Sequence, residues 1–143
     1  MPLPNVGQPT ARLAPTAATT ARLPLLIVDD EPSILDLLRE TLQDAGYPVL
    51  TASNGREALA IAQQTQLALV LADVMMPFMD GNVLSQRLRA DPSTQHLPVL
   101  LMTATRYVVT TDSATALIAK PFDLDALVAL VRRYYLEGDD AVT

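Results

Sequence analysis

Short apolar runs alternate along this chain with stretches of helical periodicity, and this alternation restricts the fold more than any other feature. The run Leu25–Val28 leads directly into acidic residues, as expected for a strand buried on both faces. Apolar residues then recur at spacings of three and four up to Gly46, the pattern of an amphipathic helix that ends at a glycine. The alternation continues with strands predicted at 49–52, 67–72, 98–102 and 116–119, and with helices predicted near 54–62, 82–90 and 123–136. Five strands alternating with helices predict an α/β fold with a doubly wound, five-stranded parallel sheet.

The chain is expected to form one domain with a short tail at each end. Its 143 residues leave room for a single hydrophobic core of normal size. Residues 1–24 hold five of the eleven prolines, two arginines and no acid, which predicts a disordered N-terminal tail. The folded domain is therefore expected over 25–137, followed by a polar C-terminal tail over 138–143.

Composition excludes several classes of function. The absence of cysteine removes disulfides, thiolate nucleophiles and thiolate metal sites. The net charge of −6 argues against nucleic-acid binding, which depends on cations that neutralise phosphates. No apolar stretch approaches the roughly 20 residues of a transmembrane helix, and no secretory signal is visible. We therefore expect a cytoplasmic protein that does not insert into a membrane.

Polar and charged side chains follow four of the five predicted strands. Parallel sheets of this kind bind ligands at the carboxyl ends of their strands, so these side chains are expected to share one edge. Carboxylates are hard oxygen ligands that suit Mg²⁺, and a neighbouring ammonium suits a phosphoryl group. The residues are Asp29, Asp30 and Glu31 after the first strand, Asp73 after the third, Thr103 and Ala104 after the fourth, and Lys120 after the fifth.

Lys120 is the only lysine among the ten basic residues, the other nine being arginine. Surface charge in this chain is therefore supplied by arginine. A single lysine between an apolar strand and a proline is better explained as a point charge that binds phosphate.

With these motifs in this order, the chain resembles the response-regulator receiver domains of bacterial two-component signalling. The resemblance covers about residues 25–135. It rests on Asp29-Asp30, on the segment 73–81, on Thr103-Ala104 and on Lys120-Pro121-Phe122. It implies the flavodoxin-like, CheY-like strand order 2-1-3-4-5.

The resemblance also implies a phosphoacceptor and a metal site. Asp73 is expected to attack the phosphorus of a phosphohistidine, which gives an acyl phosphate. Asp30, Asp73 and the main-chain carbonyl of Met75 are expected to bind Mg²⁺ or Mn²⁺ directly, with Asp29 acting mainly through a bound water. The donor would be a sensor histidine kinase or a histidine phosphotransfer protein.

Three more residues have roles that the resemblance implies. Lys120 is expected to pair with Asp73 at rest and with the phosphoryl oxygens afterwards. Thr103 is expected to turn its hydroxyl onto the phosphate, and Ala104 to keep the approach open for the donor. The Lys120–Pro121 bond is expected to be cis.

The segment between the last two strands departs from the family. From Thr103 to Lys120 is 17 positions, fewer than receivers usually have, so the fourth helix is expected to be short or missing. Receivers often have a switching aromatic residue where this chain has Leu117. Output to a downstream protein is therefore expected to use another surface, such as the first helix, or Tyr107 in place of the missing aromatic. A stand-alone receiver is expected, which would act by docking or in a phosphorelay.

Two other functions compete with this interpretation. A receiver-like module could bind partners without phosphorylation. A phosphohydrolase of the haloacid-dehalogenase type also uses an aspartate after a parallel strand, but it needs an acid two residues later, where this chain has Met75. Because Met75 and Thr105 provide no carboxylate or amide to position an attacking water, slow loss of the phosphoryl group from Asp73 is predicted.

Overall fold

The computed structural model describes residues 22–104, 113–120 and 123–142, with the backbone alone for 136–142. Several predictions fall on other residues and therefore lie outside the described part of the chain. They are the disordered tail over 1–21, the short or missing fourth helix with Tyr107, the role of Thr105, and the cis bond between Lys120 and Pro121.

Five parallel strands form a single sheet in the described residues. Their order in the sheet is β4-β3-β5-β6-β7. Numbered by their order in the chain, this is the predicted order 2-1-3-4-5, which the structure confirms. The strands are β3 (Leu25–Val28), β4 (Val49–Ala52), β5 (Leu69–Asp73), β6 (Val99–Ala104) and β7 (Ala116–Lys120).

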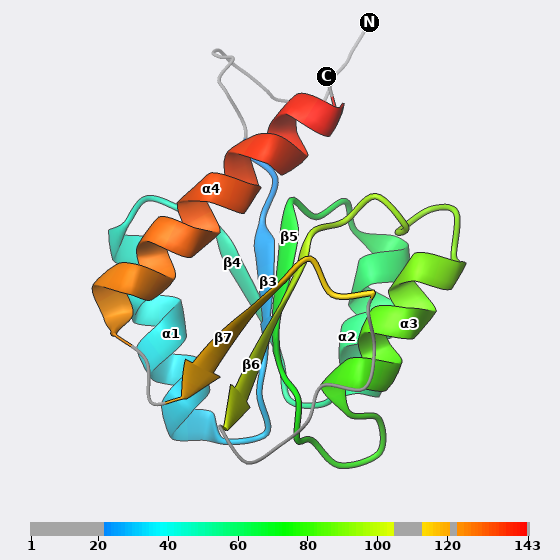
Figure 1. Ribbon diagram of the computed structural model, residues 1–143, viewed down its shortest axis with the longest axis horizontal. Coiled ribbons are helices and arrows are strands. Elements are labelled where there is room, and N and C mark those ends of the chain that lie inside the picture. The colour runs from blue at the N-terminus through cyan, green and yellow to red at the C-terminus, as the bar shows by residue number, and fades with distance from the viewer. Residues whose placement is uncertain (1–21, 105–112, 121–122, 143) are drawn as a thin grey trace, which may run out of the picture.

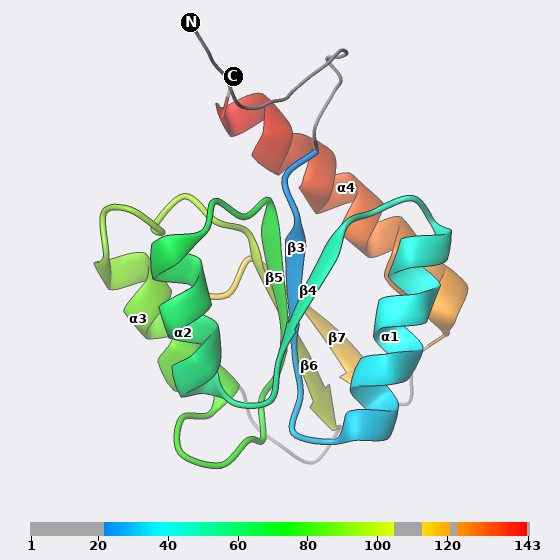
Figure 2. The same ribbon diagram turned by 180° about the vertical axis from the view of Figure 1, so that it is seen from behind.

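Helices cover both faces of the sheet, as Figures 1 and 2 show from opposite sides. On one face lie α1 (Pro32–Asp44) and α4 (Leu124–Val142). On the other lie α2 (Gly55–Gln64) and α3 (Gly81–Ala90). The predicted doubly wound architecture is therefore confirmed.

Each face of the sheet has its own hydrophobic core, because successive side chains of a strand point to opposite faces. In β3, Leu26 and Val28 pack with residues of α2 and α3, whereas Leu25 and Ile27 pack with residues of α1 and α4. All four are fully buried. Burial on both faces explains why the three central strands, β3, β5 and β6, appear in the sequence as largely apolar runs.

Side-chain caps fix where two of the helices begin. Asn54 Oδ1 accepts a hydrogen bond of 2.8 Å from the Glu57 amide at the start of α2. Asp80 Oδ1 accepts one of 2.9 Å from the Val83 amide at the start of α3. Each bond satisfies an amide that has no partner inside its helix. The start of α3, directly after the site loop, is thus set by Asp80.

The predicted end of the last helix is wrong. The last helix does not end near residue 136 but continues to Val142, because a helix once formed gains one backbone hydrogen bond for each residue added. Arg22 and Leu23, assigned to the N-terminal tail, contact the domain. The Arg22 Nη1 donates a 3.0 Å hydrogen bond to the Gly46 carbonyl, and the Tyr135 hydroxyl donates one of 2.7 Å to the Leu23 carbonyl.

Among the described residues, no helix has both the length and the apolar character needed to cross a membrane.

Candidate functional site

The carboxyl ends of the strands bring three carboxylates together at the lower edge of the sheet in Figure 1. Val28 of β3 pairs with Ala72 of β5, so the residues that follow them, Asp29 and Asp73, are neighbours. One oxygen each from Asp29, Asp30 and Asp73 lies within 4.8 Å of the other two. Parallel pairing therefore builds an acidic cluster from residues that are far apart in the sequence.

Lys120 reaches the same cluster from the last strand. Its Nζ lies 3.2 Å from Asp73 Oδ1 and 3.5 Å from Asp29 Oδ2. The lysine side chain is 24% exposed, whereas the Asp29 side chain is fully buried. The cluster thus holds three carboxylates and one ammonium, which leaves an excess of negative charge when all are ionised.

Asp29 is the most deeply buried acid of the cluster, and one of its carboxylate oxygens makes no hydrogen bond among the described residues. Its Oδ1 accepts a 3.0 Å hydrogen bond from the Glu31 amide, whereas its buried Oδ2 has only the 3.5 Å ion pair with Lys120 and no hydrogen bond among the described residues. Burial raises the pKa of Asp29 above its ordinary value, although the Glu31 amide and Lys120 oppose this and Asp30 adds to it. A buried carboxylate oxygen without a hydrogen bond, beside two further acids, is suited to a cation ligand.

The pKa values of Asp73 and Lys120 are both raised, for different reasons. Burial raises the pKa of Asp73, and the nearby Asp29 and Asp30 raise it further while Lys120 lowers it. Burial lowers the pKa of Lys120, but Asp73 and Asp29 outweigh burial and bring it above the ordinary value. Lys120 is therefore protonated at neutral pH and forms an ion pair with Asp73.

Thr103 and Ala104 end β6 beside Lys120. In the ladder between β6 and β7, Ala104 pairs with Lys120 and Thr103 pairs with Ala119. Thr103 is buried, and its hydroxyl donates a 3.0 Å hydrogen bond to the Ala104 carbonyl. The structure thus places the hydroxyl on the strand between those of Asp73 and Lys120.

A tight loop connects Asp73 to α3 and folds back onto the site. The Gly81 amide donates a 2.8 Å hydrogen bond to the Val74 carbonyl, which closes the loop. A Cβ on Gly81 would lie only 2.6 Å from the Asp73 carbonyl oxygen, so this position needs glycine. Met75 lies in the loop with its side chain 51% exposed.

One residue of this loop, Phe78, has a backbone conformation that the sequence does not predict. Phe78 has a φ of 69°, in the left-handed region, where a side chain with a Cβ costs roughly 1–2 kcal/mol. Its side chain is 79% exposed, and the Arg56 guanidinium lies 5.9 Å from the centre of its ring. Nothing in the residue type predicts this backbone conformation, because glycine and asparagine are the usual residues there.

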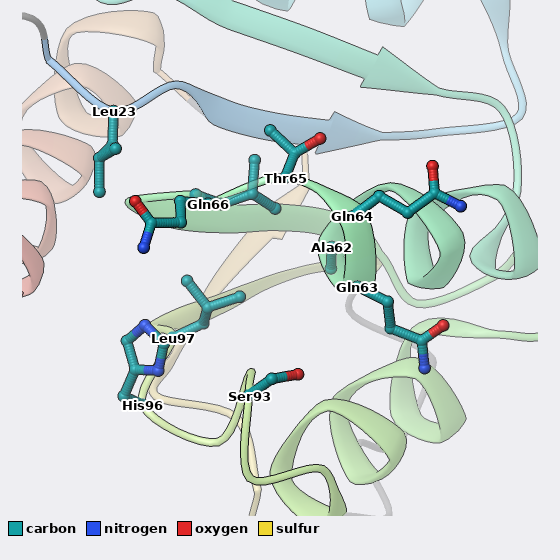
Figure 3. Close-up of a pocket in the computed structure, with 10 residues that line it drawn as sticks. Leu23, Ala62, Gln63, Gln64, Thr65, Gln66, Ser93, His96 and Leu97 are labelled. Carbon is teal, nitrogen blue, oxygen red and sulfur yellow. The ribbon is translucent and has the colours of Figure 1, made fainter.

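A separate cavity opens at the other edge of the sheet, where the strands begin. It has a volume of about 250 Å³ and is lined mainly by polar side chains from the end of α2, from the segment after it and from the segment before β6, with Leu23 at one side (Figure 3). His96 and Ser93 are among its lining residues. Because the carboxylates and Lys120 lie at the opposite ends of the strands, this cavity is not part of the acidic site.

Comparison with known proteins gives consistent matches. The family model for the response regulator receiver domain matches residues 25–132. A "DNA-binding dual master transcriptional regulator RpaA" from Synechocystis sp. is 39% identical over 113 residues, which cover 76% of this chain and 47% of that protein. An uncharacterised 14.6 kDa protein from Leptolyngbya boryana is 38% identical over 125 residues, which cover 82% of this chain and 94% of that protein.

A solved structure shows the same architecture. The chemotaxis response regulator CheY4 of Vibrio cholerae superposes with a TM-score of 0.71 and 34% identity, over 80% of this chain and 99% of that one. The chain spans about half the length of the RpaA relative, so the similarity to that protein concerns the matched part alone.

Proposed function

The chain belongs to the response-regulator receiver family, and from this premise we propose that it accepts a phosphoryl group on Asp73 from a phosphohistidine of a partner protein. The observation that supports this most is the position of Lys120. One ammonium contacts both Asp73 and Asp29 at the carboxyl ends of three separate strands. A receiver-like module that only bound partners would not need a lysine held in that place.

In the proposed reaction, an Asp73 oxygen forms a bond to phosphorus while the bond from phosphorus to the donor imidazole nitrogen breaks. The electron pair of that bond stays on the imidazole, and Asp73 becomes an acyl phosphate. Before the reaction, Lys120 pairs with Asp73 at 3.2 Å. After the transfer, its ammonium pairs with the negatively charged phosphoryl oxygens. Thr103 then gives up its bond to the Ala104 carbonyl and donates its hydroxyl to the phosphate.

The acidic cluster fits a divalent cation, with the buried and unsatisfied Asp29 Oδ2 as the main observation. We propose that Asp30, Asp73 and the Met75 carbonyl hold Mg²⁺ or Mn²⁺, with Asp29 acting through water. When bound, the ion neutralises the carboxylates and the transferred phosphoryl group. Asp73, rather than Asp30, supplies the nucleophile because Asp73 is paired with Lys120 at 3.2 Å, and no ion pair between Asp30 and Lys120 is found among the described residues.

We propose that the modified protein acts in the cytoplasm by docking to a downstream protein or by passing the phosphoryl group along a relay. The 143 residues have a net charge of −6, which makes nucleic acid an unfavourable partner for this segment itself. The DNA-binding activity named for the RpaA relative concerns a protein about twice as long as the matched region.

The test is incubation with Mg²⁺ and acetyl phosphate, followed by intact mass. The proposal expects a gain of one phosphoryl group in the wild type, and no gain in Asp73→Asn or without Mg²⁺. Met75 offers no group that could position water, so the modified form should lose its phosphoryl group slowly. If neither acetyl phosphate nor a beryllium fluoride mimic changes the mass or the amide spectra, the chain is a receiver-like module that binds partners without phosphorylation.

A further inference from the structure

Exposed apolar side chains gather beside the acidic site. Among the residues that the structure describes, six large apolar side chains are exposed, and three of these lie between the end of β5 and the first turn of α3. The three are Met75, Phe78 and Val83. Large apolar side chains grouped on one short segment at the edge of a binding site mark a surface that another molecule covers.

Phe78 is the most unusual of the three. Its backbone has a φ of 69° although it is not glycine, and its side chain is 79% exposed. Burial of the ring therefore contributes too little free energy to offset the cost of the unfavourable backbone conformation. Strained residues of this kind persist mainly where a function uses them.

Arg56, in the first turn of α2, gives this surface its charge. Its guanidinium lies 5.9 Å from the centre of the Phe78 ring, within reach of a cation–π contact. Arg56 is exposed, and no ion pair to it is found among the described residues. The ring and the guanidinium together offer an apolar contact next to an unneutralised positive charge.

The position of the loop indicates what covers this surface. The loop leaves the site at Asp73 and returns to it at Gly81, whose amide bonds to the Val74 carbonyl. Asp73 is only 9% exposed, so a phosphohistidine that reaches it brings its protein against the rim of the site. A small phosphodonor makes no such contact, since it enters the site without covering the rim.

We propose that Phe78 and Arg56 form a docking surface for the protein phosphodonor and determine which donors are used. The matching donor surface has an apolar side chain that packs on the Phe78 ring and a carboxylate that pairs with Arg56. This inference rests on the proposed function, because it requires that Asp73 accepts a phosphoryl group.

The experiment measures phosphotransfer to the full chain from two kinds of donor. The protein donors are the purified, autophosphorylated histidine kinases of the organism from which the chain comes, tested one by one, and the fastest is retained. The small donor is acetyl phosphate. The variants are Phe78→Ala, Phe78→Gly, Arg56→Ala and Arg56→Glu, with Leu50→Ala as a control because Leu50 is an exposed apolar residue on β4.

Removing a central aromatic anchor is expected to lower kcat/KM with the kinase by about thirtyfold, through a higher KM. Phe78→Ala and Phe78→Gly should show the same loss, although only glycine relieves the backbone strain and raises the melting temperature. Arg56→Glu should lose more than Arg56→Ala, and the difference should shrink at high salt. All variants should react with acetyl phosphate as the wild type does.

Several outcomes would overturn the docking proposal. One is an unchanged KM for the kinase in both Phe78 variants, and another is an equal loss with acetyl phosphate. A third is the absence of transfer from every kinase while acetyl phosphate still modifies Asp73. Failure of the proposed function would look different, because acetyl phosphate would then leave the wild type unmodified as well.

Discussion

Replacing Asp29 with asparagine should stabilise the metal-free protein at neutral pH, although it removes an ion pair. The side-chain oxygen of asparagine can take the place of Oδ1 and accept the hydrogen bond from the Glu31 amide, so that bond is retained. Lys120 does not lose its only counter-ion, because Asp73 remains 3.2 Å away. What disappears is one buried negative charge with an unsatisfied oxygen.

The size of the effect follows from the geometry. At an effective dielectric constant of about 20, the 3.5 Å contact attracts Asp29 to Lys120 by about 4.7 kcal/mol. Repulsion between Asp29 and Asp73 at the 4.8 Å limit is about 3.5 kcal/mol, and the exposed Asp30 adds roughly half as much. Attraction and repulsion nearly cancel, so the cost of burying the charge determines the sign. Replacing a whole buried ion pair with apolar residues often stabilises a protein by about 1–4 kcal/mol, and because Lys120 keeps Asp73 as its counter-ion, we expect about 2 kcal/mol for Asp29→Asn.

The assay is urea denaturation in EDTA at several pH values. With a slope of about 2 kcal/mol per molar, the variant's midpoint at pH 7 should lie about 1 M urea higher than that of the wild type. Burial raises the pKa of Asp29, so the wild type is most favoured where the carboxyl is protonated and loses stability as the pH rises. The advantage of the variant should therefore vanish below the ordinary pKa of 3.8 and grow as the pH rises through the folded pKa.

A matched control separates this effect from charge removal in general. Asp36 lies on the surface of α1 and pairs with Arg39 at 2.9 Å, so Asp36→Asn should change the stability by less than about 1 kcal/mol. Mg²⁺ should also stabilise the wild type more than Asp29→Asn. A lower midpoint for Asp29→Asn at pH 7 in EDTA would refute the reasoning, because Lys120 would then overcompensate the acids and leave no excess charge for a cation.

Three further changes test other parts of the structure. Lys120→Gln should lower the free energy of unfolding at pH 7 by about 2 kcal/mol, because two buried carboxylates lose their counter-ion, and urea denaturation in EDTA measures this loss. Gly81→Ala should cost about 2 kcal/mol in the same assay, since the new Cβ would lie 2.6 Å from the Asp73 carbonyl oxygen and force the loop to move. Tyr135→Phe removes the 2.7 Å hydrogen bond to the Leu23 carbonyl and should cost about 1 kcal/mol, visible as a lower melting temperature; an unchanged value would show that this bond adds nothing to the fold.

The positions of the central strands could be predicted from the sequence because burial on both faces gives a largely apolar run, whereas the edge strands β4 and β7 are only partly buried. The first two strands have the predicted bounds, Leu25–Val28 and Val49–Ala52. The third was predicted over 67–72 but is Leu69–Asp73. Residues 67 and 68 are apolar and buried yet precede the strand, because pairing with the neighbouring strands sets its ends. Hydrophobicity alone does not report that pairing.

Helix ends were harder to predict than strands, for a related reason. Residues 137–140 of the last helix are Glu-Gly-Asp-Asp, so the apolar pattern breaks off there and does not predict the continuation to Val142. At the other end, Arg22 lies over the rings of Tyr47 and Tyr135, at 5.5 and 5.7 Å from their centres. An arginine in a proline-rich stretch gives no local sign of such a contact.

By itself, the sequence determined which residues would meet at the site, because parallel strands bring their carboxyl ends to one edge whatever lies between them. The acids after β3, the acid at the end of β5 and the lysine at the end of β7 could be assigned to that edge from their places alone. Only the tertiary structure decided how each one is surrounded. Asp29 is buried and Asp30 is exposed although they are adjacent, and Phe78 takes a positive φ inside a loop closed by Gly81. Burial, charge balance and backbone strain depend on neighbours that are distant in the chain, and the local spacing of residues does not encode them.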